Sequence, residues 1–143
     1  SMEHDGYESD KQRIMLYDLE SGERKDLTAN LDQTCYSYAW SDDDSKIYFI
    51  SPFMGTREIF VYNFADQSFR QVTKDLHDIN AFEIKGDKIY TQEVSMSRPA
   101  EIFVYDINGE KAQGQQISAI NTDVLSKVNM GKVANGTLVR VLL

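Results

Sequence analysis

The sequence predicts an all-β protein, and within that class a partial β-propeller of about two full four-stranded antiparallel blades plus part of another. A strand-like hexapeptide occurs three times, at Arg13–Asp18, Glu58–Asn63 and Glu101–Asp106. Each copy is followed by a second marker, an aliphatic residue and then threonine or serine, at 27–28, 72–73 and 117–118. The hexapeptide's tyrosine, at 17, 62 and 105, recurs after 45 and then 43 residues, and the pair recurs after 45 and 45. Periods near this length are typical of propeller blades.

The middle hexapeptide is the stretch around which the rest is arranged. Four apolar or aromatic side chains follow one another from Ile59 to Tyr62. β-Branched and aromatic residues favour strands, and an uninterrupted apolar run favours burial of both faces. We therefore predict a strand here that is covered on both sides.

Each hexapeptide is predicted to form a hairpin with the strand that follows it. After a connection at 1–11, the first such hairpin pairs 12–19 with 24–28. A polar turn joins the two strands in every repeat, at 20–23, 65–68 and 108–111. The third turn contains Asn108-Gly109, a pair that suits a tight hairpin.

A second pair of strands is predicted between these hairpins. Residues 34–40 and 46–50 are strand-like and flank the acidic turn Ser41–Ser45. The next repeat has the same arrangement at 79–84 and 88–91. Four short antiparallel strands joined by short turns make up one propeller blade.

These repeats divide the chain into a partial blade at 1–32, full blades at 33–75 and 76–120, and a linker and hairpin at 121–143. Residues 121–130 are predicted as a short helix, with Thr122 or Asp123 at its N-cap, or as an irregular link. Residues 131–143 are predicted as a hairpin that turns at Asn135-Gly136. Because so few blades cannot close a ring, we expect a fragment that self-associates through its open blade edges.

The composition is that of a globular, acidic protein. Fifteen Lys and Arg against 23 Asp and Glu give a net charge of −8, which argues against nucleic acid or an anionic membrane as partner. The sequence has no signal peptide and no run of about 20 apolar residues, the length that a membrane helix needs. Its single cysteine, Cys35, lies in an apolar-alternating run and is predicted to be a small buried residue.

Motifs for catalysis, cofactors or metals are missing from the sequence. It contains no Gly-x-Ser-x-Gly elbow, no Gly-x-Gly-x-x-Gly and no phosphate-binding loop, so we assign no catalytic residue and no cofactor. Asp42–Asp44 lacks the ligand spacing of a calcium loop and is predicted as a solvated turn. His4 and His77 have no neighbouring Cys or His, which argues against a zinc site.

Two kinds of repeat position are predicted to join blades. His77 follows Asp32 by one period of 45 residues, so we expect it to make hydrogen bonds between blades. The three tyrosines of the hexapeptide, Tyr17, Tyr62 and Tyr105, are predicted to pack between blades.

The order of several short segments along the chain is also informative. These segments are Asp5–Lys11, Leu27-Thr28, Asp32, Ala39–Asp43, Ser95–Ile102, Ile117-Ser118 and Asn121. Over about residues 3–130, this order resembles the propeller domain of the prolyl oligopeptidase family of serine peptidases. Within that family the order looks like that of the branch of bacterial dipeptidyl and acylaminoacyl peptidases. Ser95–Ile102, with Ile117-Ser118 and Asn121 after it, is similar to the last blade before the hydrolase domain. Residues 82–86 depart from the Trp-Ser-x-Asp pattern of that branch, and 131–143 match its crossover into the hydrolase poorly.

The resemblance implies a specific role. In this family a C-terminal α/β-hydrolase domain carries the Ser, Asp and His of catalysis, and the propeller covers it. The propeller limits access to short peptides and can help to hold the substrate's amino terminus. The chain is then a non-catalytic part of a serine exopeptidase, with 121–143 leading toward the hydrolase domain. Glu8 and Asp10 are the candidates for meeting a peptide's ammonium group.

Two questions stay open at this point. The resemblance is compatible with either the periplasm or the cytoplasm of a bacterium. The alternative function is a stand-alone propeller-like module that binds proteins in the bacterial envelope. An open reading frame that continues into a Gly-x-Ser-x-Gly elbow would favour the peptidase.

Overall fold

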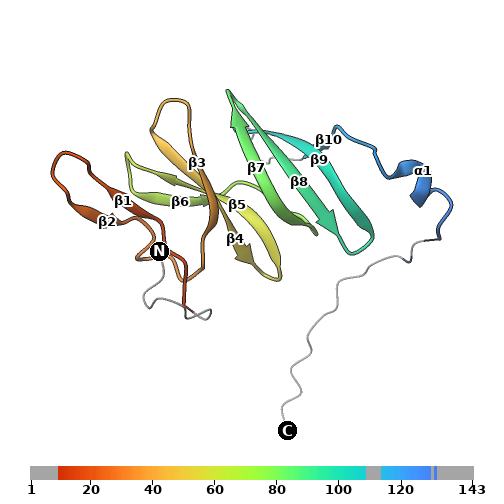
Figure 1. The fold of residues 1–143 in the computed structure, drawn as a ribbon, viewed down its shortest axis with the longest axis horizontal. Coiled ribbons are helices and arrows are strands. Elements are labelled where there is room, and N and C mark those ends of the chain that lie inside the picture. The colour runs from red at the N-terminus through yellow and green to blue at the C-terminus, as the bar shows by residue number, and fades with distance from the viewer. Residues whose placement is uncertain (1–9, 109–113, 130, 132–143) are drawn as a thin grey trace, which may run out of the picture.

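The computed structural model describes residues 10–108, 114–129 and 131. These residues form short strands and one helical turn (Figure 1). The strands are β1 (Met15–Tyr17), β2 (Arg24–Asp26), β3 (Tyr36–Trp40), β4 (Lys46–Phe53), β5 (Thr56–Asn63), β6 (Ser68–Gln71), β7 (Asp78–Lys85), β8 (Lys88–Ser95), β9 (Arg98–Asp106) and β10 (Gln115–Gln116), and the helix is α1 (Thr122–Leu125).

The strands group into a hairpin and two four-stranded units that lie side by side (Figure 1). β1 and β2 pair as a separate two-stranded sheet. We call β3–β6 the first unit and β7–β10 the second unit. In both units consecutive strands pair antiparallel. The units meet where β5 and β7 run parallel, with Arg57 opposite Asp78.

β5 is buried on both faces, as its sequence predicts. Successive side chains of a strand point to opposite faces, and here the two faces pack against different neighbours. Ile59 and Val61 join an apolar cluster with residues of the second unit, including Ile79. Phe60 and Tyr62 instead join a cluster with residues of the β1–β2 hairpin and β4. β5 therefore holds three parts of the molecule together.

The apolar contact between the two units is referred to below as the seam cluster. The first unit supplies its Tyr48, Ile50, Ile59, Val61 and Val72, and the second unit its Ile79, Ile89, Phe103 and Tyr105. Each of these side chains is buried. At roughly 25 cal/mol per Å² of apolar surface removed from water, this contact is the main attraction between the units.

The prediction for the repeat tyrosines is right for two of the three. Tyr62 and Tyr105 are 3% exposed and pack in the two apolar clusters, but Tyr17 is 52% exposed. The difference follows from the pairing of the strands. β5 lies between β4 and β6, and β9 lies between β8 and β10, whereas β1 pairs with β2 alone among the described strands.

The short helix, Thr122–Leu125, lies within the predicted 121–130, but its N-cap differs from both candidates. Asn121, not Thr122 or Asp123, is at the N-cap, and its side chain makes no capping bond. The Asn121 side-chain amide instead donates to Glu101, at 3.2 Å, so a contact with β9 takes the place of the local cap.

Other predictions fall wholly or partly outside the described residues. These are most of the turn at 108–111, the hairpin at 131–143 with its turn at Asn135-Gly136, and the candidate residue Glu8. Within the part of the chain that is described, no helix is long and apolar enough to span a bilayer.

Candidate functional site

The two sequence features that mark the repeat, the hexapeptide and the pair that ends in threonine or serine, contact each other in space. Glu58 opens the middle hexapeptide, and Thr73 lies just after β6, the strand that pairs with β5. The Thr73 hydroxyl donates to the Glu58 carboxylate at 2.6 Å and accepts from the Ile59 amide at 2.9 Å. In the second unit, the Ser118 hydroxyl donates to the Glu101 carboxylate and accepts from the Ile102 amide. A carboxylate and a hydroxyl thus tie the third strand of each unit to the end of the fourth.

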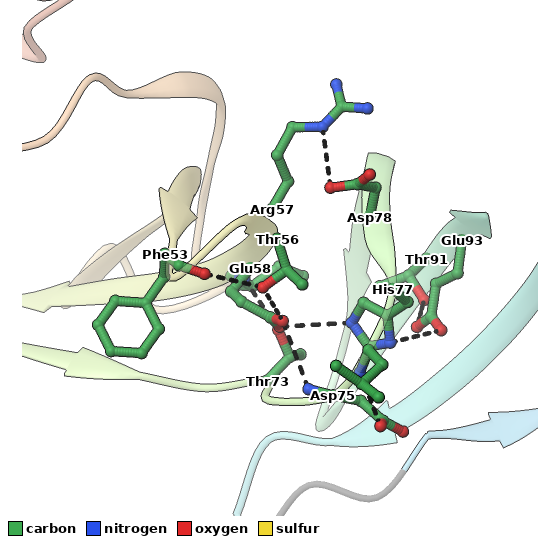
Figure 2. Close-up of polar contacts among 12 residues, drawn as sticks. Phe53, Thr56, Arg57, Glu58, Thr73, Asp75, His77, Asp78, Thr91 and Glu93 are labelled. Carbon is green, nitrogen blue, oxygen red and sulfur yellow. Dashed lines mark hydrogen bonds and ion pairs between the residues drawn. The ribbon is translucent and has the colours of Figure 1, made fainter. Parts of the chain in front are cut away.

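His77 lies between two buried carboxylates at the junction of the units (Figure 2). Its Nε2 is 3.3 Å from Glu58 Oε2, and its Nδ1 is 3.2 Å from Glu93 Oε2. Glu58 comes from β5 and Glu93 from β8, while His77 precedes β7. The imidazole is 3% exposed and both carboxylates are 1% exposed. The predicted place of His77 between blades is confirmed, and its contacts there are ion pairs with one carboxylate from each unit.

Further donors surround the two carboxylates. Glu58 also accepts from the Thr56 hydroxyl at 2.9 Å. Glu93 accepts from the Thr91 hydroxyl at 2.7 Å and from the Tyr105 hydroxyl, and Arg98 Nη2 lies 3.5 Å away. Buried charges are tolerated when they are paired and hydrogen-bonded. These donors meet that condition from both units.

The surroundings shift the pKa values of three titratable groups at the centre, Glu58, His77 and Tyr105. Burial alone would raise the pKa of Glu58, but the hydrogen bonds from His77 and Thr73 outweigh burial and lower it below 4.5. Burial alone would lower the pKa of His77, but the hydrogen bond to Glu58 and the charges of Glu93, Glu58 and Asp75 raise it above 6.5. Burial, followed by the hydrogen bond to Glu93, raises the pKa of Tyr105.

The arrangement is suited to holding charges together rather than to bond chemistry. A general base needs a free ring nitrogen beside the group from which it takes a proton. Both nitrogens of His77 face carboxylates, so the ring has none left to activate a nucleophile. Cys35 is also inert, because burial raises the pKa of its thiol to about 11.

A cavity of about 540 Å³ adjoins His77. The turn between β4 and β5 contributes Met54, the link between β6 and β7 contributes Leu76, and the turn between β8 and β9 contributes Met96. These side chains are 90%, 57% and 86% exposed. We call the surface formed by these three residues the methionine face. It spans both units and places apolar side chains in water.

The two candidates for peptide binding lie elsewhere or outside the described part. Asp10 is half-buried and lines a separate cavity of about 290 Å³, together with Lys11, Gln12 and Asp32 among others. Glu8 is outside the described residues. Their part in holding a peptide's amino terminus stays a prediction.

The carboxylate partners of His77 were missed from the sequence. Glu58 could have been found, because Glu101 holds the same position of the hexapeptide in the next repeat. Glu93 carries no such signal, since Ser51 stands at the matching position when 46–50 is aligned with 88–91. The fold alone brings Glu93 to the second nitrogen of the ring.

The strand arrangement defines the class of protein as a β-propeller, and solved structures agree. The trilobed protease of Pyrococcus furiosus has a β-propeller domain that aligns with a TM-score of 0.62 at 19% identity, over 82% of this chain and 34% of that one. TolB from Acinetobacter baumannii aligns with a TM-score of 0.56 at 19% identity, over 76% of this chain and 27% of that one. The predicted fold class, an all-β partial propeller, is confirmed.

The similarity extends to particular peptidases. The chain is 27% identical over 128 residues to dipeptidyl-peptidase 5 of Porphyromonas gingivalis, which covers 90% of this chain and 18% of the relative. The acylaminoacyl peptidase of Pyrococcus horikoshii aligns with a TM-score of 0.63 at 20% identity, over 82% of this chain and 17% of that one. No family model matches. The resemblance to the propeller of dipeptidyl and acylaminoacyl peptidases is confirmed, and the chain spans about a fifth of these relatives' length.

Proposed function

We propose that this chain is a non-catalytic section of the β-propeller of a dipeptidyl or acylaminoacyl serine peptidase, and that it gates and selects short peptides for an α/β-hydrolase domain. The observation that carries the proposal is the sequence similarity to dipeptidyl-peptidase 5 over 90% of the chain. The surroundings of His77 support the proposal that this section is non-catalytic. Both ring nitrogens face carboxylates, so the imidazole is not free to act as a base.

The methionine face is the surface best suited to meet the hydrolase domain or its substrates. Exposed apolar side chains that gather on one face mark contact sites more often than scattered ones do. Met54, Leu76 and Met96 gather around one cavity and come from both units. By contrast, the turn between β3 and β4 carries Asp42–Asp44, whose charges favour contact with water.

The experiment uses the full-length protein that contains this section. We expect Met54→Glu with Met96→Glu to change kcat/KM for a chromogenic dipeptide relative to a longer peptide, because charges at this face would disturb its contact with the hydrolase domain. Leu19→Glu is the matched control, since Leu19 is 88% exposed but does not line this cavity. An unchanged ratio in the double variant would contradict the proposed gating face.

The role of the isolated chain is tested separately. We expect no turnover of a chromogenic dipeptide by the 143-residue chain. Robust serine-dependent cleavage would contradict its non-catalytic role. The alternative, a stand-alone binding module of the bacterial envelope, predicts that the gene ends without a hydrolase domain.

We also propose that the isolated chain self-associates through an open strand edge. β1 has one neighbour among the described strands, and its Met15 and Tyr17 are 39% and 52% exposed. An unpaired edge with apolar side chains is a template for pairing with another chain.

A further inference from the structure

The geometry around the His77 ring favours the imidazolium, in which both ring nitrogens carry a proton. Each nitrogen lies within 3.3 Å of a carboxylate oxygen, of Glu58 on one side and of Glu93 on the other. A neutral imidazole has one N–H, so its second nitrogen would direct a lone pair at a carboxylate. The imidazolium has two N–H groups and one positive charge, so it can form an ion pair at each nitrogen.

We propose that His77 is a cationic link between the two units, which holds the seam closed while the ring carries its proton and lets it loosen when the proton is lost. The link joins β5 of the first unit to β8 of the second through the segment that connects the units (Figure 2). It goes beyond the proposed function and does not depend on it.

Among the described residues, the other side-chain contacts of a polar kind across the seam are exposed. Arg57 Nε lies 3.5 Å from Asp78 Oδ1, with both side chains more than two-fifths exposed. Its Nη2 donates to Asn80 at 2.7 Å, and the Gly86 amide donates to Asp42 at 3.2 Å. Exposed pairs contribute little because water screens them. We therefore expect the buried ring to have the largest effect of the polar side-chain contacts on this seam, beside the β5–β7 pairing and the seam cluster.

The charges around the ring are balanced only when it is protonated. Glu58 faces it from β5, Glu93 from β8 and Asp75 from the link, while β9 brings the Tyr105 hydroxyl and Arg98 to Glu93. On β7, Asp78 pairs with Arg57. Arg98 offsets one of the two buried carboxylates and the imidazolium offsets the other. Loss of the ring proton leaves a buried negative charge without a partner, which is strongly destabilising.

The direction of the pH effect follows from the raised pKa of His77. Burial opposes the charged form, but the hydrogen bond to Glu58 and the neighbouring carboxylates outweigh burial, so the pKa is higher in the folded chain than the ordinary 6.5. The stabilisation is then complete below about pH 6.5 and is lost as the pH rises through the folded pKa.

The decisive measurement is the protonation state of the ring in the folded 143-residue chain. The sequence has two histidines, so His4→Gln leaves a single imidazole for ¹⁵N-edited NMR. We expect both nitrogens of His77 to carry protons at neutral pH, with a titration midpoint above 6.5. A ring that is neutral at pH 7, or a midpoint at or below 6.5, would overturn the proposal.

The link to the seam is tested by thermal unfolding. We expect the Tm of the His4→Gln protein to fall by about 4 °C or more between about pH 6 and pH 8.5, and the His77→Gln variant to lose this dependence. If His77→Gln does not fold, the amide protection factor of Ile79 in the His4→Gln protein replaces it. The protection factor is corrected for the intrinsic rise of amide exchange with pH, and it should fall with the loss of the ring proton. The proposal would be overturned by a pH dependence of the Tm that persists unchanged in His77→Gln. It would also be overturned by an Ile79 protection factor that stays constant as His77 titrates.

Discussion

At the scale of residues, Glu58 and Glu101 occupy the same position of the repeated hexapeptide but have different surroundings. Both accept a hydrogen bond from the hydroxyl that ends the next strand. Glu58 also faces His77, whereas Glu101 accepts from the backbone amides of Ile120 and Asn121, at 3.2 and 3.0 Å. The same repeat position therefore forms a buried ion pair in the first unit and accepts hydrogen bonds from the backbone before α1 in the second unit.

This pair provides a matched test of the buried ion pair. Glu58→Gln removes the charge beside the imidazolium but keeps the size of the side chain. We expect it to lower the free energy of unfolding by about 3 kcal/mol, because the cations His77 and Arg98 then share one buried carboxylate, Glu93. Glu101→Gln is the control, and we expect a smaller loss because no histidine faces it. Equal losses by urea unfolding would mean that the hydroxyl and amide contacts carry the effect.

At the scale of elements, the hairpin between β4 and β5 has an unusual turn. Phe53 pairs with Thr56, so Met54 and Gly55 form a two-residue loop, and their φ angles are +50° and +90°. Such turns prefer Asn-Gly because both positions need a positive φ. A methionine there is strained and is also 90% exposed. Neither turn chemistry nor burial explains it, which agrees with the proposed contact through the methionine face.

The strain in this turn can be measured. We expect Met54→Asn to raise the free energy of unfolding by about 0.5–1 kcal/mol, since asparagine tolerates a positive φ. We expect Gly55→Ala to lower it by about 1 kcal/mol, since alanine does not. Met96→Asn is the control, because Met96 is exposed in a turn but is not among the described residues with a positive φ. Stabilisation by Met96→Asn of the same size would point to reduced apolar exposure instead.

At the scale of the whole molecule, the strand pairing leaves the β1–β2 hairpin incomplete. In the two units, the strand that carries the hexapeptide has neighbours on both sides, and its aromatic residues are buried. In the hairpin, the same positions carry Met15 and Tyr17, which are partly exposed. The difference arises from pairing and not from composition, because the three hexapeptides are similar.

The open edge gives a prediction about the state of the isolated chain. We expect light scattering at high concentration to give a mass above the 16.4 kDa of one chain. Met15→Lys with Tyr17→Lys should return the mass to that of one chain, because charges on an edge oppose pairing. Leu19→Lys should not, since Leu19 lies in the turn and outside the strand. A clean monomer of the unchanged chain would contradict self-association.

Much of the architecture could be predicted from the sequence because it depends on local patterns of residues and on their repetition. The period of the two markers indicates the strand groups, and the apolar run from Ile59 to Tyr62 indicates a strand covered on both faces. These features depend on neighbours in the chain and on a repeat. The ends of two strands were predicted too early, since β4 and β8 both extend beyond the predicted 46–50 and 88–91.

The amino-acid sequence by itself determined the repeat, the strand-rich class and the place of His77 at a junction between blades. The tertiary structure alone decided that Glu93 meets the second nitrogen of that ring and that Tyr17 stays in water. The reason is that the neighbours of a side chain across a sheet or a seam come from distant parts of the chain. A repeat predicts such neighbours where its positions match, as for Glu58 and Thr73, and it has no signal for them where a unique residue such as Glu93 takes part.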